Sequence, residues 1–122
     1  MLRETQKKTL TRLRAEYRDL ANGARSKTLI PKDYQGGTIT VSNLGDYGVE
    51  RFFAIINPPQ SVIVSVGTIV KKPVLNAAGS VVAGQRMTVG ISCDHRVVDG
   101  VVGARFLSEL KELLEHPAVM LI

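Results

Sequence analysis

The residue types best suited to chemistry gather in one short segment, residues 92–100, with the sequence SCDHRVVDG. Its histidine, His95, is followed four residues later by a carboxylate, Asp99, and then directly by Gly100. Histidine is the side chain whose charge changes nearest to neutral pH, so it can accept and return a proton. A nearby carboxylate can orient the imidazole ring, and the glycine permits a positive φ or a close backbone approach. The spacing therefore favours acid–base chemistry at His95.

The residues alone leave other interpretations of this segment open. Asp94, Arg96 and Asp99 can form a solvated ion-pair cluster, and Asp99 can simply cap a following helix. Cys93 and His95 are two residues apart, a spacing that points both to one face of a strand, so a cysteine nucleophile is a further alternative. A metal site is disfavoured, because no second histidine lies nearby and the cysteine is alone.

His95 is expected at a junction between a strand and a helix, where catalytic groups are often held on a rigid frame. Residues 87–91 are apolar and β-rich, and residues 101–115 have the spacing of an amphipathic helix that Pro117 ends. The side chains that this helix is predicted to bury are Val102, Phe106, Leu107, Leu110, Leu113 and Leu114.

The remaining segments predict an α+β fold. Apolar residues at three- and four-residue spacing predict a helix over 4–24, and a single turn is expected over 31–34. Strands are predicted over 38–42, 52–56, 61–70 and 86–92, with a hairpin of 72–75 and 79–83 around a turn at 76–78. The order of a helix, several mostly antiparallel strands and a second helix is that of α+β proteins.

Composition excludes several classes of protein. With 122 residues, 44% of them hydrophobic, the chain suits one globular domain and is too apolar to be disordered. The net charge is +5, but aromatic residues are only 5% and no nucleic-acid-binding motif is present, so we expect a solvated basic helix face and no nucleic-acid partner. The single cysteine excludes an intrachain disulfide and fits a reducing compartment. We expect neither a signal peptide nor a membrane-spanning segment.

Four segments together resemble a known family. Residues 94–100, DHRVVDG, are similar to the D-H-R-x-x-D-G signature of the dihydrolipoamide acyltransferases, the core-forming acyltransferase subunits of the 2-oxo acid dehydrogenase complexes. Residues 36–45 (GGTITVSNLG), 54–60 (AIINPPQ) and the ending from 106 to 121 resemble other segments of that family in the same order. The acetyl-transferring branch, that of pyruvate dehydrogenase, is the most similar one.

The resemblance implies a fold and a reaction. The fold would be the chloramphenicol-acetyltransferase-like fold of CoA-dependent acyltransferases, with residues 1–122 forming the C-terminal half of the catalytic domain. The reaction would move an acyl group, expected to be acetyl, between dihydrolipoamide and coenzyme A. His95 would be the general base for the CoA thiol, and Ser42 would donate a hydrogen bond to the oxyanion. Asp99 would fix the local geometry through ion pairs. Asp46 and the charged pair at 50–51 depart from the family pattern.

The resemblance also implies partners. The substrates would be CoA and a lipoyl group carried on a separate lipoyl domain. In the family, the catalytic histidine and serine come from neighbouring subunits of a trimer, and trimers build a larger core. That core binds the decarboxylase and dihydrolipoamide dehydrogenase components, in the bacterial cytoplasm or the mitochondrial matrix. The apolar tail, residues 118–122, is expected to be buried against a partner or against its own domain.

Two alternatives are kept beside this hypothesis. One is a catalytically silent core-assembly module, or a truncated fragment of such an enzyme, that keeps the trimer contacts without a complete site. The other is an acyltransferase for small acceptors, of the chloramphenicol type, because the shorter H-x-x-x-D-G pattern occurs there as well.

Overall fold

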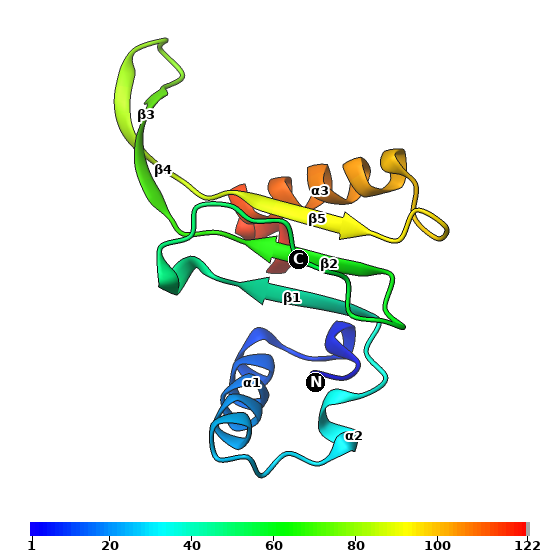
Figure 1. The fold of residues 1–122 in the computed structure, drawn as a ribbon. Helices are drawn as coiled ribbons and strands as arrows, with labels where there is room; N and C mark the ends of the chain where they lie inside the picture. The colour runs from blue at the N-terminus through cyan, green and yellow to red at the C-terminus, as the bar shows by residue number, and fades with distance from the viewer. Residues whose placement is uncertain (122) are drawn as a thin grey trace. The chain divides into compact units, whose positions relative to one another are not determined.

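The computed structural model describes residues 1–121, and of Leu121 only the backbone. The chain divides into two compact units, Met1–Thr38 and Ile39–Ile122 (Figure 1). The members of the candidate site all belong to the second unit. None of the helices in the described residues is both long and apolar enough to cross a membrane.

The first unit contains η1 (Thr5–Lys7), α1 (Leu10–Arg25) and α2 (Pro31–Tyr34). The helix predicted over 4–24 therefore begins six residues late. Glu4 has a φ of 47°, in the left-handed region, so a right-handed helix does not start there. Thr9 instead caps α1, because its hydroxyl oxygen accepts a hydrogen bond from the Arg12 backbone N–H at 3.4 Å. The turn predicted at 31–34 is confirmed as α2.

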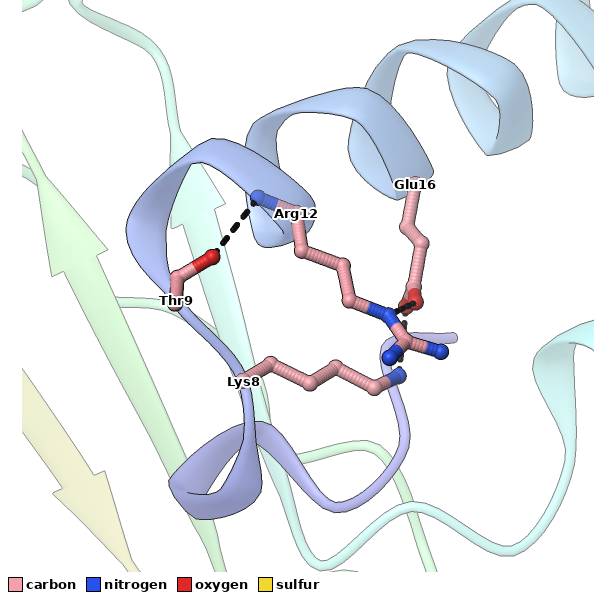
Figure 2. Close-up of polar contacts among 4 residues, drawn as sticks. All are labelled: Lys8, Thr9, Arg12 and Glu16. Atoms are coloured by element: carbon pink, nitrogen blue, oxygen red, sulfur yellow. Dashed lines mark hydrogen bonds and ion pairs between the residues drawn. The ribbon is translucent and has the colours of Figure 1, made fainter.

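Part of the basic charge of this unit is neutralised internally. Figure 2 shows Lys8 and Arg12 converging on Glu16, with Nζ–Oε2 and Nε–Oε1 distances of 2.6 and 3.2 Å. The hydrogen bond from Lys8, followed by that from Arg12, lowers the pKa of Glu16 against the opposing effect of desolvation. The Arg12 side chain, 69% exposed, fits the interpretation of a solvated helix face, whereas Lys8 lies before α1 and its side chain is only 15% exposed.

The second unit is built on a three-stranded sheet with the order β1-β2-β5 (Figure 1). The strand β1 (Ile39–Asn43) pairs in parallel with β2 (Val62–Val66), and β2 pairs antiparallel with β5 (Val89–Cys93). A separate hairpin consists of β3 (Val70–Leu75) and β4 (Val81–Arg86). The short helix η2 (Gly45–Tyr47) follows β1, while α3 (Gly100–Glu115) and η3 (Pro117–Leu121) complete the chain. The α+β class and the mostly antiparallel pairing are confirmed.

The two faces of this sheet differ in chemistry. A Cβ added to Gly103 of α3 would lie 3.7 Å from the Cys93 sulfur, so the Cys93 side chain points towards the helix. Because side chains alternate along a strand, the opposite face carries Thr40, Ser42, Ser65 and Ser92. We call this the hydroxyl face. The helix therefore covers one face, and the hydroxyl groups lie on the other.

The prediction of a strand over 52–56 is wrong. The segment has no strand partner among the described residues, although its burial alternates and leaves Phe53 and Ile55 93% and 90% exposed. A Cβ on Gly67 would lie 1.9 Å from the Glu50 carbonyl oxygen, so the chain crosses closely over the end of β2. The burial of residues 52–56 alternates because one side of this extended segment is partly covered and the other side is exposed. This alternation is the same pattern that a strand in a sheet produces.

Other boundaries also differ from the prediction. The strand expected over 61–70 is split, because β2 ends at Val66 and β3 begins at Val70. Gly67 still bonds to the Thr88 carbonyl in the register of β5, but the next N–H, that of Thr68, donates to the Val49 carbonyl instead. The hairpin and its turn are confirmed, but β4 runs on to Arg86, so β5 is shorter than the predicted 86–92 strand.

The burial predicted for the last helix is only partly correct. Leu107, Leu110 and Leu113 are half-buried. Val102, Phe106 and Leu114 are instead exposed, because α3 packs chiefly against β5 within the described part of this unit. The tail residues Val119 and Met120 are exposed as well. The Leu121 side chain and Ile122, which belong to the apolar tail discussed above, lie outside the described residues.

Candidate active site

His95 lies in the turn between β5 and α3, which confirms the predicted strand-to-helix junction. The Asp94 N–H donates to the Ser61 carbonyl at 2.8 Å, which ties the turn to the chain just before β2. The Asp94 carbonyl in turn accepts bonds from Val97 and Val98, each at 2.9 Å. The His95 side chain is exposed and has no hydrogen-bond partner among residues 1–121. The backbone is thus fixed, while the imidazole is free to meet a ligand.

Asp94 and Arg96 flank the histidine and pair with each other. The Arg96 guanidinium donates to both Asp94 oxygens, the shortest distance being 2.6 Å from Nη2 to Oδ2. The Arg96 backbone N–H donates to the same carboxylate at 3.0 Å. These bonds, the side-chain bond above all, lower the pKa of Asp94 to about 2. The carboxylate therefore stays ionised at neutral pH and holds the turn, so it is not a proton acceptor there.

Asp99 caps α3. Its Oδ1 accepts a hydrogen bond of 2.8 Å from the Val102 N–H, and its own φ and ψ of −78° and 171° are extended, as at an ordinary N-cap. The ion pairs that the family resemblance implied for Asp99 are not present among residues 1–121, where the recorded contact of this carboxylate is the cap. Asp99 fixes the local geometry through the start of the helix instead.

Ser42 lies near the end of β1, half-buried on the hydroxyl face. The strand register places it opposite Ser65 of β2, which is itself opposite Gly90 of β5. His95 lies two residues after Cys93. Cys93 itself is three residues beyond Gly90 on β5, and β5 is two strands away from β1. Strand dimensions then give roughly 14 Å between the backbones of Ser42 and Cys93. One copy of the chain therefore does not bring Ser42 and His95 together.

Ser65 is a residue that sequence reasoning missed. It is a buried polar side chain, 6% exposed, between Ser42 and Gly90 in register. A Cβ on Gly90 would lie 2.7 Å from the Ser65 Oγ, so the hydroxyl occupies space that only a glycine leaves free. A cavity of about 130 Å³ borders Ser65, Gly90, Phe52 and Phe53. The sequence did contain a sign of this residue, because Ser65 is the one polar residue in the otherwise apolar strand VIVSV.

The structure also bears on the two alternatives to an acid–base site, a cysteine nucleophile and a metal site. The Cys93 thiol points to Gly103 and is half-buried, so it faces the helix. In the described part of the chain, no group of three or more His, Cys, Asp or Glu side chains is positioned to hold a metal ion.

Comparison with known proteins decides the family. The model of the 2-oxoacid dehydrogenases acyltransferase catalytic domain matches residues 1–122. The chain belongs to this acyltransferase family. The resemblance stated from the sequence motifs is therefore confirmed.

Individual members of the acyltransferase family agree. The chain is 43% identical over 122 residues to the dihydrolipoyllysine-residue acetyltransferase component of the pyruvate dehydrogenase complex of Rickettsia felis, covering all of this chain and 29% of that protein. It is 48% identical over 116 residues to the mitochondrial counterpart of Caenorhabditis elegans, covering 94% of this chain and 23% of that protein. The chain thus spans less than a third of these curated relatives.

Solved structures of the acyltransferase family show the same fold. Azotobacter vinelandii dihydrolipoamide acetyltransferase has a TM-score of 0.92 and 33% identity, with 99% of this chain and 49% of that chain covered. The cubic core of the pyruvate dehydrogenase multienzyme complex has a TM-score of 0.87 and 35% identity, with coverages of 94% and 47%. This chain therefore matches about half of each solved chain.

Proposed function

We propose that this chain carries the catalytic residues of an acyltransferase that moves an acetyl group between dihydrolipoamide and coenzyme A. The observation that carries the proposal is His95 itself, exposed in a turn whose backbone is fixed at both sides, in a chain matched over its full length by the acyltransferase family. The names of the relatives, dihydrolipoyllysine-residue acetyltransferases, support the choice of acetyl.

In the proposed reaction, an imidazole nitrogen of His95 accepts the proton of the CoA thiol. The sulfur attacks the carbonyl carbon of acetyl-dihydrolipoamide, a new C–S bond forms, and the carbonyl oxygen becomes an oxyanion. The Ser42 hydroxyl donates a hydrogen bond to that oxyanion. Collapse breaks the C–S bond to the dihydrolipoyl sulfur, which takes the proton back from the imidazolium. Asp94 and Asp99 hold the turn and the helix start that position the imidazole.

A solved relative supports these roles. The study of the Azotobacter enzyme concerns a serine, a histidine and an asparagine in its catalytic mechanism. The histidine and asparagine there are four positions apart, as His95 and Asp99 are here, and the serine precedes the histidine by nearly the same interval as Ser42. Asparagine is as good a helix cap as aspartate, which agrees with a positioning role for Asp99.

The complete site is proposed to need two copies of the chain. The backbones of Ser42 and Cys93 are roughly 14 Å apart along and across the sheet, and His95 lies in the turn beyond Cys93, whereas a general base acts at about 3 Å. A second copy can supply the missing partner, and a trimer in which each copy contacts two neighbours would make three equivalent sites. The cubic core formed by a solved relative supports assembly beyond a monomer.

The wider setting is proposed on the same basis. Residues 1–122 would form the C-terminal half of the catalytic domain, and lipoyl domains, the decarboxylase and dihydrolipoamide dehydrogenase would be its partners in the complex. Relatives from bacteria and from mitochondria support the bacterial cytoplasm or the mitochondrial matrix as the compartment.

The test is acetyl transfer from acetyl-CoA to dihydrolipoamide by the purified chain, with His95→Ala as the comparison. Loss of about 10²–10⁴ in rate is expected for that variant, because a positioned general base is typically worth that much. Normal turnover of His95→Ala would refute the role of His95.

A silent assembly module is the second candidate. Its supporting observation is that the chain matches only about half of each solved relative. An oligomer by light scattering without any turnover would favour this second function.

A further inference from the structure

A small cavity lies where residues 51–53 pass over the sheet, beside the strands β2 and β5. Its volume is about 130 Å³. Liquid water takes roughly 30 Å³ per molecule, so the cavity has the room of about four water molecules. Its lining includes Gly67 and Gly90, which have no side chains to fill it, and the aromatic ring of Phe52. The second unit is therefore open to a small ligand at this point.

The Ser65 hydroxyl group is available to a ligand in this cavity. The residue is only 6% exposed, yet its Oγ forms no hydrogen bond with another group of residues 1–121. No wholly buried polar side-chain atom of these residues lacks a partner, so the Ser65 Oγ keeps some accessible surface. The Oγ lies beside Gly90, since a Cβ there would be 2.7 Å from it, and both residues line the cavity. The hydroxyl group therefore faces the cavity, where a ligand can satisfy it.

The charge at the cavity is positive. Arg51 lines the cavity and is exposed, and its guanidinium forms neither an ion pair nor a hydrogen bond within the described part of the chain. The neighbouring carboxylate, that of Glu50, pairs with Lys72 at 2.7 Å instead. None of the described residues that line the cavity is acidic. An anion would therefore meet a guanidinium that no carboxylate of the lining neutralises.

The lining combines hydrogen-bond donors with an apolar wall. A guanidinium can donate two parallel hydrogen bonds to one carboxylate, and a serine hydroxyl can donate a further one. Phe52 offers apolar contact to a short alkyl group, which inorganic phosphate lacks. We propose that this cavity binds a short-chain carboxylate anion, such as propionate. Arg51 and Ser65 hold its carboxylate, and Phe52 contacts its alkyl group. This binding does not depend on the catalytic roles proposed above.

The experiment is a titration of the full 122-residue chain with propionate at constant ionic strength, followed through the backbone amide signals in NMR spectra. Saturable shifts are expected at Ser65, Gly67 and Gly90. Propionamide has nearly the same shape without the charge, and it should bind at least about tenfold more weakly, because hydrogen bonds to charged groups are the stronger ones. Inorganic phosphate, which has no alkyl group for the apolar wall, should also bind at least about tenfold more weakly.

Two matched arginine variants separate this site from a general attraction of anions. Arg51→Gln should weaken propionate binding at least about tenfold. Arg105→Gln removes the same charge from α3, outside the cavity lining, and should change the binding little. Ser65→Ala removes only the hydroxyl group and should weaken binding by about threefold or more. Unchanged amide signals away from the cavity would show that each variant keeps its fold.

Several results would overturn the proposal. Absence of saturable shifts at Ser65 and Gly90 up to about 0.1 M propionate would mean that the cavity holds only water. Equal weakening by Arg51→Gln and Arg105→Gln would assign the effect to overall charge. Binding of phosphate as tight as that of propionate would make this a general anion site. Because the readout is binding, these results stand or fall separately from the acetyl-transfer assay.

Discussion

Mixing two inactive variants should restore acetyl transfer. His95→Ala removes the proposed base, and Ser42→Ala removes the proposed oxyanion donor, which should cost about 10²–10⁴ and 10²–10³ in rate respectively. The backbones of Ser42 and Cys93 are roughly 14 Å apart by strand dimensions, so one copy should not use both its own side chains on one thioester.

The magnitude follows from this separation. If each site takes His95 from one copy and Ser42 from its neighbour, an equal mixture gives both native residues in about one quarter of the sites of a closed symmetric oligomer. Activity near 25% of the native chain is therefore expected, against about 1% or less for either variant alone.

The assay is acetyl transfer from acetyl-CoA to dihydrolipoamide after the two variants are unfolded and refolded together. Variants refolded separately and assayed directly after they are combined are the control, because each oligomer then formed from one variant alone. An activity of the co-refolded mixture no greater than the mean of the two variants would refute a site shared between copies.

Three further predictions concern the turn and the sheet. Asp99→Ala should lower the free energy of unfolding by about 1 kcal/mol in urea titrations, whereas Asp99→Asn should stay close to the native value because it keeps the helix cap; equal losses in both would exclude capping. The folded pKa of Asp94 is lowered from 3.8 to about 2, so the carboxylate stabilises the fold above about pH 4 and this contribution disappears as the pH falls towards 2. Arg96→Gln should therefore flatten the pH dependence of the unfolding midpoint in that window, and an unchanged profile would contradict the pairing. Gly90→Ala should destabilise the unit by about 1–3 kcal/mol because the new Cβ overlaps the Ser65 hydroxyl, and adding Ser65→Ala should recover part of the loss; additive effects in the double-mutant cycle would show that the two do not touch.

Local sequence patterns predicted the elements that depend on neighbouring residues. The hairpin of β3 and β4, the short α2 helix and the strand-to-helix junction at His95 follow from turn residues and apolar spacing within a few positions. The N-cap role of Asp99, one of the alternatives kept open from the sequence, has the same local origin, since it involves the N–H of a residue three positions later.

Patterns that depend on distant packing misled the prediction. Residues 52–56 alternate in burial without belonging to a sheet, because one side of an extended segment is covered by the end of β2. The spacing of Val102, Phe106 and Leu114 is that of a buried helix face, yet all three are exposed, because spacing does not say whether a partner surface is present.

The sequence by itself singled out His95 and Asp99 through their residue types and spacing, and Ser42 through the resemblance of its segment to the acyltransferase family. The tertiary structure alone decided that Ser42 aligns with Ser65 and Gly90, and so lies far from His95 in one copy. The physical reason is that strand register is set by backbone hydrogen bonds between segments tens of residues apart, and these bonds leave no local pattern in the side chains.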